Sequence, residues 1–245
     1  MPGLAAEFER HPGIWRGAEL ARTVCPGIAT GFAALDAELP GGGWPCAALT
    51  EILPQHEGIG ELRILGPALA QLAAQGKFIA WIAPPHLPYA PALAAAGIGL
   101  GRVLIVKTAK DSDSLWAAEQ ALGSAACGAV LAWPRDIRFT QLRRLQLAAE
   151  GGRCLAMLFR PPQAAREPSP AALRIALATA AGGLALSILK RRGAPLSRPI
   201  LLPALSAPLV VAGNSPSLGS DAHVMDSPTS TAAAAGSLSA RLALA

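Results

Sequence analysis

A loop rich in glycine and acidic residues stands where an α/β nucleotide-binding protein would hold a phosphate. The apolar run 47–53 is typical of a strand, the loop 54–62 follows it, and an Ala/Leu-rich segment comes next. This strand–loop–helix order is that of phosphate-loop proteins, which need glycines so that backbone N–H groups can surround the phosphates. They also need a Lys for the β- and γ-phosphate charges and a Ser or Thr for Mg²⁺.

The loop lacks both of these side chains. Counted from the strand, the lysine position falls on Gly60 and the Ser/Thr position on Glu61. A carboxylate at Glu61 would repel a triphosphate, and Pro54 removes a backbone donor. We therefore predict a degenerate phosphate loop, made by Pro54, Gly58, Gly60 and Glu61, and no bound cofactor.

Strands and helices are predicted to alternate through the middle of the chain, which positions this loop. Apolar runs typical of strands are 47–53, 77–83, 103–106, 127–133 and 153–159, and helical segments are 62–75, 91–97, 115–122 and 135–150. The segments 173–178 and 183–189 are predicted to form a closing hairpin. The alternation predicts an α/β fold with a mostly parallel sheet and helices on both faces.

The composition favours one large folded domain with extensions. The chain has 245 residues, of which 52% are hydrophobic and 15% charged, and a formal net charge of +5. These values exclude disorder of the whole chain and permit an acidic or nucleic-acid partner without requiring one. We predict an N-terminal arm at 1–29, a core domain at 30–212 and a disordered, Ser/Ala/Gly/Pro-rich tail at 213–245. Within the core domain, 200–211 is expected to pack as an extended strap.

The cysteines and the lack of long apolar segments indicate a cytoplasmic protein. The chain has no C-x-x-C pair, no apolar signal segment near its start, and no uninterrupted apolar run of about 18 residues. We therefore expect reduced thiols, no metal site and no membrane association. The four single cysteines are Cys25, Cys46, Cys127 and Cys154.

The glycine-rich block before the first strand carries a family resemblance. Residues 30–45 read TGFAALDAELPGGGWP. With the strand order that follows, this block resembles the start of the ATPase core in the RecA family, and within it the ImuA family. SulA-type cell-division inhibitors are a smaller relative of the same kind. The resemblance implies a RecA-like sheet and a role in the DNA-damage (SOS) response.

The same resemblance points to two further positions from which catalytic acids are missing. RecA-like ATPases place a catalytic carboxylate after the second strand, where this chain has Pro84-Pro85-His86, and a metal-binding Asp after the fourth, where it has Trp133. A tryptophan cannot coordinate a metal, and a lone loop histidine is more often solvated than catalytic. We therefore predict that the chain is not an enzyme.

Basic residues gather in two segments. The first is the end of the closing hairpin and the second is the helix 135–150. Two interpretations remain open: a solvated face that protects the sheet edge from aggregation, or a contact site for the DNA backbone or an acidic partner. The candidate contact residues are Lys190, Arg191, Arg192, Arg198, Arg143 and Arg144, and Arg135, Arg138, Arg153 and Arg160 add to the positive charge.

Three functions follow. The leading hypothesis is a non-catalytic RecA-like accessory protein of SOS-induced, error-prone translesion synthesis. The resemblance implies that such a protein recruits or regulates a Y-family polymerase-like protein and an error-prone C-family DNA polymerase, with RecA and DNA as further candidate partners. The second is a SulA-like SOS inhibitor of cell division that binds the tubulin-like division protein. The third is an atypical RecA-like ATPase. The full block at 30–45 and the chain length favour the first hypothesis.

Overall fold

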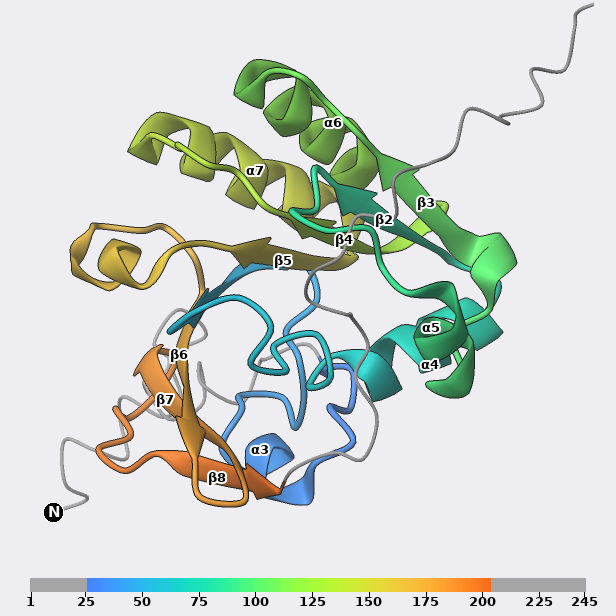
Figure 1. The fold of residues 1–245 in the computed structure, drawn as a ribbon. Coiled ribbons are helices and arrows are strands. Elements are labelled where there is room, and N and C mark those ends of the chain that lie inside the picture. Colours follow the sequence, from blue (N-terminus) through green and yellow to red (C-terminus); the bar gives the residue numbers. More distant parts are fainter. Residues whose placement is uncertain (1–25, 204–245) are drawn as a thin grey trace, which may run out of the picture. The chain divides into compact units, whose positions relative to one another are not determined.

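The computed structural model describes residues 26–203, in which one mixed sheet forms the centre of the molecule (Figure 1). The strands of this described part follow the order β3-β2-β4-β5-β1-β6-β7-β8. All pairs from β3 through β6 are parallel, whereas β7 and β8 are antiparallel to their neighbours. The strands are β1 (Ala48–Pro54), β2 (Phe78–Ile82), β3 (Val103–Val106), β4 (Cys127–Ala132), β5 (Leu155–Phe159), β6 (Leu173–Ala180), β7 (Gly183–Lys190) and β8 (Ile200–Pro203).

Helices lie on both faces of this sheet. In Figure 1, α6 and α7 run side by side over one face, and α4 and α5 lie over the other. The predicted α/β fold with a mostly parallel sheet is confirmed. The helices are α3 (Ala33–Asp36), α4 (Gly66–Ala74), α5 (Ala90–Ala95), α6 (Asp111–Gly123) and α7 (Phe139–Gly152), with 3₁₀ turns η1 (Leu100–Arg102) and η2 (Pro162–Arg166).

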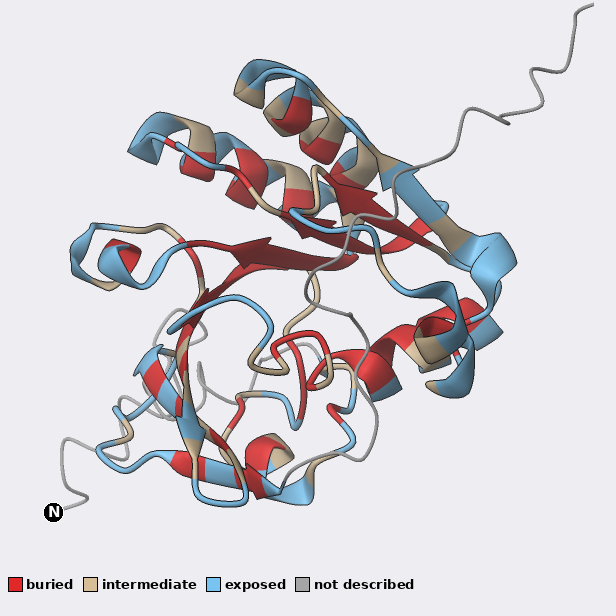
Figure 2. Cartoon of the chain, in the orientation of Figure 1, coloured by how far each residue is buried: buried red, intermediate tan, exposed pale blue. Residues whose placement is uncertain are grey.

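Two apolar clusters, one on each face, make up the core. Successive side chains of a strand point to opposite faces, so β2 contributes to both. Ile79 and Trp81 belong to the cluster that includes α4, whereas Ala80 and Ile82 belong to the cluster that includes α6 and α7. The central strand β1 is buried at all seven positions. Continuous apolar runs such as 47–53 are typical of strands covered on both faces, and Figure 2 shows the central strands red.

Three helices begin at residues other than those predicted from the sequence pattern. The helix predicted at 62–75 begins at Gly66, because residues 61–65 form turns and Pro67 is suited to the first helical positions. The helix predicted at 135–150 begins at Phe139. The preceding residue, Arg138, caps it, because its backbone N–H donates to Oε1 of Gln141. The helix predicted at 115–122 begins four residues earlier, at Asp111, where acidic residues suit the positive end of the helix dipole.

The predicted extensions lie mostly outside the described residues. Only 26–29 of the predicted arm are described, and Ile28 forms a β-bridge with Trp44. Of the predicted strap at 200–211, Ile200–Pro203 forms strand β8 and the remainder is outside the described range. The tail at 213–245 is outside it as well. Among residues 26–203, no helix is long and apolar enough to cross a lipid bilayer.

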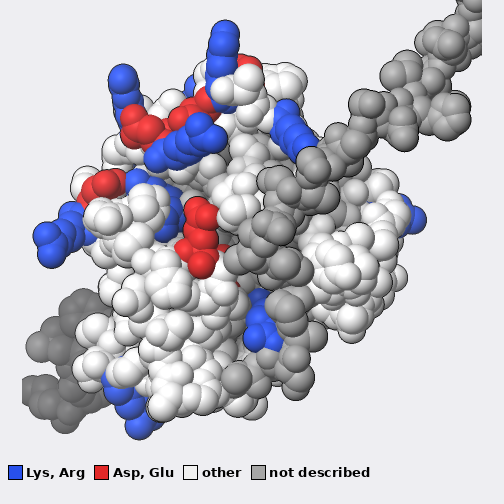
Figure 3. All heavy atoms as spheres, in the orientation of Figure 1, with Lys and Arg blue, Asp and Glu red and all other residues white. Residues whose placement is uncertain are grey.

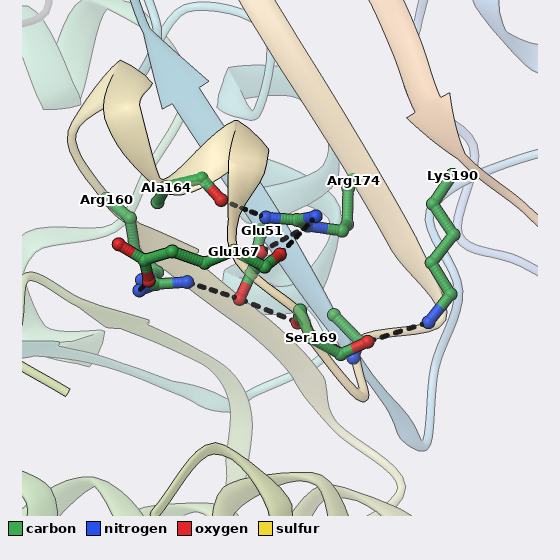
Figure 4. A network of polar contacts seen from close by, with 8 residues as sticks. Glu51, Arg160, Ala164, Glu167, Ser169, Arg174 and Lys190 are labelled. Atoms are coloured by element: carbon green, nitrogen blue, oxygen red, sulfur yellow. Dashed lines mark hydrogen bonds and ion pairs between the residues drawn. The ribbon is translucent and has the colours of Figure 1, made fainter. Parts of the chain in front are cut away.

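A buried carboxylate joins the parallel strands to the antiparallel ones. Glu51, in the middle of β1, is 0% exposed. Its two oxygens accept from Arg160 Nη1 at 3.1 Å, from Arg174 Nε at 2.6 Å and from Ser169 Oγ at 2.8 Å. These partners come from the end of β5, from β6 and from the segment between them (Figure 4). One carboxylate therefore contacts three neighbouring parts of the fold.

The two guanidinium groups are satisfied by the segment that contains η2. Arg174 donates to the carbonyl oxygens of Ala164 at 2.6 Å and Glu167 at 3.1 Å, and Arg160 pairs with the Glu167 carboxylate at 2.5 Å. The negative charges of two carboxylates thus offset the positive charges of two guanidinium groups. These side chains are Glu51, Glu167, Arg160 and Arg174. Arg160, which the sequence analysis grouped with the basic residues of a solvated face or a contact site, is buried inside this network.

We predict that Glu51→Ala destabilises the protein strongly. Removal of the carboxylate leaves two buried guanidinium groups without their shared counter-charge, which costs about 3–5 kcal/mol for a buried pair. Equilibrium urea unfolding measures this loss. The matched control is Glu119→Ala, which breaks an exposed 2.6 Å pair with Arg144 and should cost less than about 1 kcal/mol. Equal losses in both variants would contradict this role for Glu51.

Candidate functional site

The loop after β1 folds around the side chain of Glu61. The backbone N–H of Gly58 donates to Glu61 Oε1 at 3.0 Å, and that of Gly60 donates to Oε2 at 3.1 Å. Both glycines have positive φ, +82° and +107°, a conformation that side chains rarely adopt. Glu61 itself is only 8% exposed. The carboxylate therefore lies inside its own loop.

This arrangement changes what the loop can bind. Successive backbone N–H groups form a concavity that suits an anion, and in a phosphate loop that anion is the ligand. Here the two N–H groups of Gly58 and Gly60 already bond to an internal carboxylate. Pro54 is the last residue of β1, and α4 begins only at Gly66. The structure does not confirm that this loop is a RecA-like phosphate loop. That the loop binds no nucleotide stays a prediction.

The carboxyl ends of three parallel strands carry stacked aromatic rings. Trp81 and Trp133 stack with ring centroids 5.5 Å apart, and Trp133 and Phe159 with centroids 4.5 Å apart. These residues stand at the ends of β2, β4 and β5, where an open α/β sheet holds its ligands. Rings in contact bury apolar area and offer no carboxylate to water or metal.

Other groups that could do chemistry in the described part are few. His86 lies 3.4 Å from the Glu57 carboxylate, and both side chains are exposed. Burial raises the pKa of the Cys154 thiol to about 12, and the neighbouring Cys127 adds to the shift. Burial also raises the pKa of Cys127, partly offset by a hydrogen bond with Ser124. These thiols stay protonated at neutral pH and are poor nucleophiles. No group of three His, Cys, Asp or Glu within 26–203 could hold a metal.

The predicted basic contact residues are dispersed and mostly engaged within the protein. Lys190 Nζ donates to the Ser169 carbonyl at 2.9 Å, Arg191 Nη1 contacts Glu38 Oε2 at 3.0 Å, and Arg198 lies 4.0 Å from the same carboxylate. Arg144 pairs with Glu119 at 2.6 Å. On the face drawn in Figure 3, basic side chains are spread apart and several adjoin acidic ones.

The side chains of Arg143 and Arg192 form no hydrogen bond or ion pair among the described residues. No hydrogen bond or ion pair in that range joins α7 to the end of β7 either. The two basic segments that the sequence analysis grouped together are therefore not joined by a polar contact among the described residues. Their role in contacting DNA or a partner remains untested.

An exposed apolar edge is the feature that sequence reasoning missed. Strand β3 forms one edge of the sheet, and its Leu104 and Ile105 are 44% and 41% exposed. Leu100, before the strand, is exposed too, as are Leu87 and Tyr89 before α5. Figure 2 shows β3 largely pale blue beside red neighbouring strands. The run 103–106 looks like a buried strand in the sequence, and only the strand order reveals that it is an edge.

Basic side chains flank this apolar edge. Arg102 precedes β3 and lies over the ring of Phe78, 5.0 Å from its centroid. Lys107 and Lys110 follow the strand and are exposed. An apolar strip with positive charge at both ends is suited to a protein partner that is apolar and acidic. We define residues 100–107 as the β3 edge.

The segment that contains the β3 edge is the part shared with known proteins. Residues 49–156 match the family model described as cell division inhibitor SulA. Two curated relatives carry the same name. The relative from Edwardsiella piscicida is 32% identical over 100 residues, which are 41% of this chain and 60% of that protein. The relative from Photorhabdus laumondii is 29% identical over 112 residues, 46% of this chain and 63% of that protein. Part of this chain is therefore similar to the SulA family.

The extent of this similarity is limited. The chain spans about three fifths of the length of these two SulA relatives. The solved structure of SulA from Pseudomonas aeruginosa gives a TM-score of 0.39 with 23% identity, covering 48% of this chain and 99% of that one. The SulA relationship suggested in the sequence analysis holds for the matched segment, whereas assignment to the ImuA family is not shown.

The leading functional hypothesis of the sequence analysis needs correction. It predicted an accessory role in translesion synthesis, with two polymerases, RecA or DNA as partners. The matched relatives are named as cell division inhibitors instead. The residues 30–45, which carried the ImuA resemblance, lie outside the matched segment. The polymerase partners are contradicted by these relatives.

We predict that Glu61→Ala loosens the loop after β1. Loss of the carboxylate leaves the N–H groups of Gly58 and Gly60 without acceptors, which should lower the free energy of unfolding by about 1–3 kcal/mol. Urea unfolding measures this loss. The control is Glu57→Ala, because Glu57 is exposed in the same loop and, within residues 26–203, pairs only with His86. A stability loss in Glu57→Ala as large as that in Glu61→Ala would refute the special role of Glu61.

Proposed function

We propose that this protein is a SulA-like inhibitor of cell division that binds the tubulin-like division protein and catalyses no reaction itself. The observation that carries the proposal is the match of residues 49–156 to the SulA family model. A protein that stops division after DNA damage also fits the SOS response. The proposal takes over the second hypothesis of the sequence analysis in place of the first.

The β3 edge is the contact surface in this proposal. The matched segment runs from β1 to the start of β5, so it contains α5, β3 and the loops around them. The exposed Leu100, Leu104 and Ile105 lie within it, whereas the exposed Leu189 and Leu201 lie outside it. Burial of this apolar edge by a partner makes a favourable contribution to the free energy of binding.

The edge offers hydrogen bonds as well as apolar area. Among residues 26–203, strand β3 pairs only with β2, so the backbone groups on its other side face away from the sheet. An extended segment of a partner can add there as a further strand, with specificity from side chains such as Leu104. The contact keeps one molecule of the division protein out of the growing polymer for each inhibitor bound.

Absence of catalysis is the second part of the proposal. Its support is the internal carboxylate–amide contact of Glu61, together with the aromatic stack of Trp81, Trp133 and Phe159 at the strand ends. We also infer that the sheet descends from a RecA-like core whose phosphate site has been lost, since the loop 55–65 still connects a central strand to a helix.

We predict that the purified full chain reduces the amount of GTP-dependent polymer formed by the division protein, in proportion to its molar ratio. Sedimentation of polymer measures the effect. Leu104→Asp should weaken the inhibition at least about tenfold, because a desolvated apolar contact is lost and a charge is placed at the interface.

The matched control is Leu189→Asp. Leu189 is 45% exposed, nearly the same as the 44% of Leu104, but it lies on β7 outside the segment shared with SulA. Thermal melting establishes that both variants are folded. An inactive wild-type chain would refute the proposed function, and equal impairment by both variants would refute the assignment to the β3 edge.

We also predict that titration of the protein with Mg²⁺ and ATP or GTP gives no heat of binding. The loop N–H groups already have an acceptor, and a phosphate would have to displace the Glu61 carboxylate against charge repulsion. Isothermal titration calorimetry is the measurement. Micromolar affinity for ATP would instead support the atypical ATPase.

A further inference from the structure

A cavity lies between the loop after β1 and the antiparallel end of the sheet. Its volume is about 300 Å³, near the lower end of the roughly 300–1,000 Å³ of small-molecule sites. The walls come from the start of α3, the loop after β1, the β6–β7 turn and β8. They are mostly apolar, and the lining includes Phe32, Ile59, Arg63, Gly183, Leu184 and Leu202.

Arg63 is the one charged residue that the described part of the chain contributes to this lining. Its Nε atom is buried and has no hydrogen-bond partner, and its guanidinium forms no ion pair among residues 26–203. The nearest acidic residue in sequence, Glu61, is bonded to the N–H groups of Gly58 and Gly60 instead. A partly buried cation without a counter-charge is unfavourable, and an anion in the cavity would relieve it.

Three glycines lie in or beside the wall of this cavity. A Cβ added to Gly60 would lie 3.4 Å from Cδ of Arg63 and 3.5 Å from Cδ1 of Leu184, so the glycine sits close to two lining side chains. Gly182 and Gly183, at the β6–β7 turn, line the cavity with backbone atoms alone. Gly182 has a φ of +78°, which a tight turn requires.

We propose that this cavity binds a small molecule that carries one carboxylate on an apolar body. The single guanidinium matches a single negative charge, and its planar donors fit the two oxygens of a carboxylate. The apolar lining, Phe32, Ile59 and Leu202 among it, takes the rest of the ligand. A phosphate carries more charge than one guanidinium compensates in this setting.

The inference goes beyond the proposed function. The residues Phe32, Gly183, Leu184 and Leu202 lie outside the segment shared with SulA, and only the residues of the loop after β1 lie within it. The site also lies away from β3, since β8 and β3 are the two opposite edges of the sheet. Binding at the cavity can therefore be tested without the division protein.

The experiment uses the full chain and three probes: 4-phenylbutyrate, its uncharged analogue 4-phenylbutanol, and inorganic phosphate. Ligand-observed NMR and thermal shift should show saturable binding of the carboxylate, with the alcohol and phosphate at least about tenfold weaker. Arg63→Met keeps an unbranched apolar stem and should weaken carboxylate binding at least about tenfold. Arg63→Lys should recover part of the affinity because it restores the charge.

Arg143→Met is the matched control. It also removes one positive charge, from a side chain of α7 that has no ion pair among the described residues. It should leave carboxylate binding unchanged. The proposal is overturned if the wild-type chain does not bind the carboxylate, if Arg63→Met binds it as tightly as wild type, or if phosphate or the alcohol binds equally well. If Arg63→Met fails to fold, the test is decided by how the wild-type chain binds the three probes.

Discussion

A fully buried carboxylate in the central strand constrains how the rest of the sheet is built. Glu51 pairs in register with Arg174 on β6, and the end of β5 supplies Arg160. A slip of β6 by one residue would move Arg174 to the opposite face and leave the carboxylate without its guanidinium. Since an unpaired buried charge costs several kcal/mol, the network selects one register at the junction where the parallel strands meet the antiparallel ones.

This junction divides the molecule into parts with different roles. The strands β2, β3, β4 and most of β1 belong to the segment shared with SulA, and they carry the exposed edge. The strands β6, β7 and β8 lie outside it, and the β6–β7 turn, the start of β7 and β8 form one wall of the cavity at Arg63. The loop of Glu61 belongs to the shared segment and also lines this cavity, through Ile59 and Arg63.

The sequence was sufficient to locate β1 to β7, but it did not predict β8 as a strand or the contacts between the strands. Short continuous apolar runs such as 127–133 predict buried strands, because such a run is a local property of the sequence. Helix starts were displaced by capping and by Pro67, which override the apolar pattern. The Glu51 network could not be predicted, since its partners lie 109 and 123 residues away in the chain. For the same reason Arg160 was misassigned to the surface, and the exposure of Leu104 depended on a strand order that spacing does not encode.

The charges around β3 bear on which partner covers it. If two copies of the chain paired through this edge in antiparallel fashion about its centre, Arg102 of one copy would face Lys107 of the other. Like charges opposite each other in a sheet are destabilising, so the basic ends oppose self-association while they attract an acidic segment. The aliphatic side chains Leu104 and Ile105 nevertheless stay exposed, without proline or a bulge to protect the strand. The charges of this edge disfavour pairing with a second copy of the chain, while its centre stays apolar. Both features are best explained by binding to a different protein.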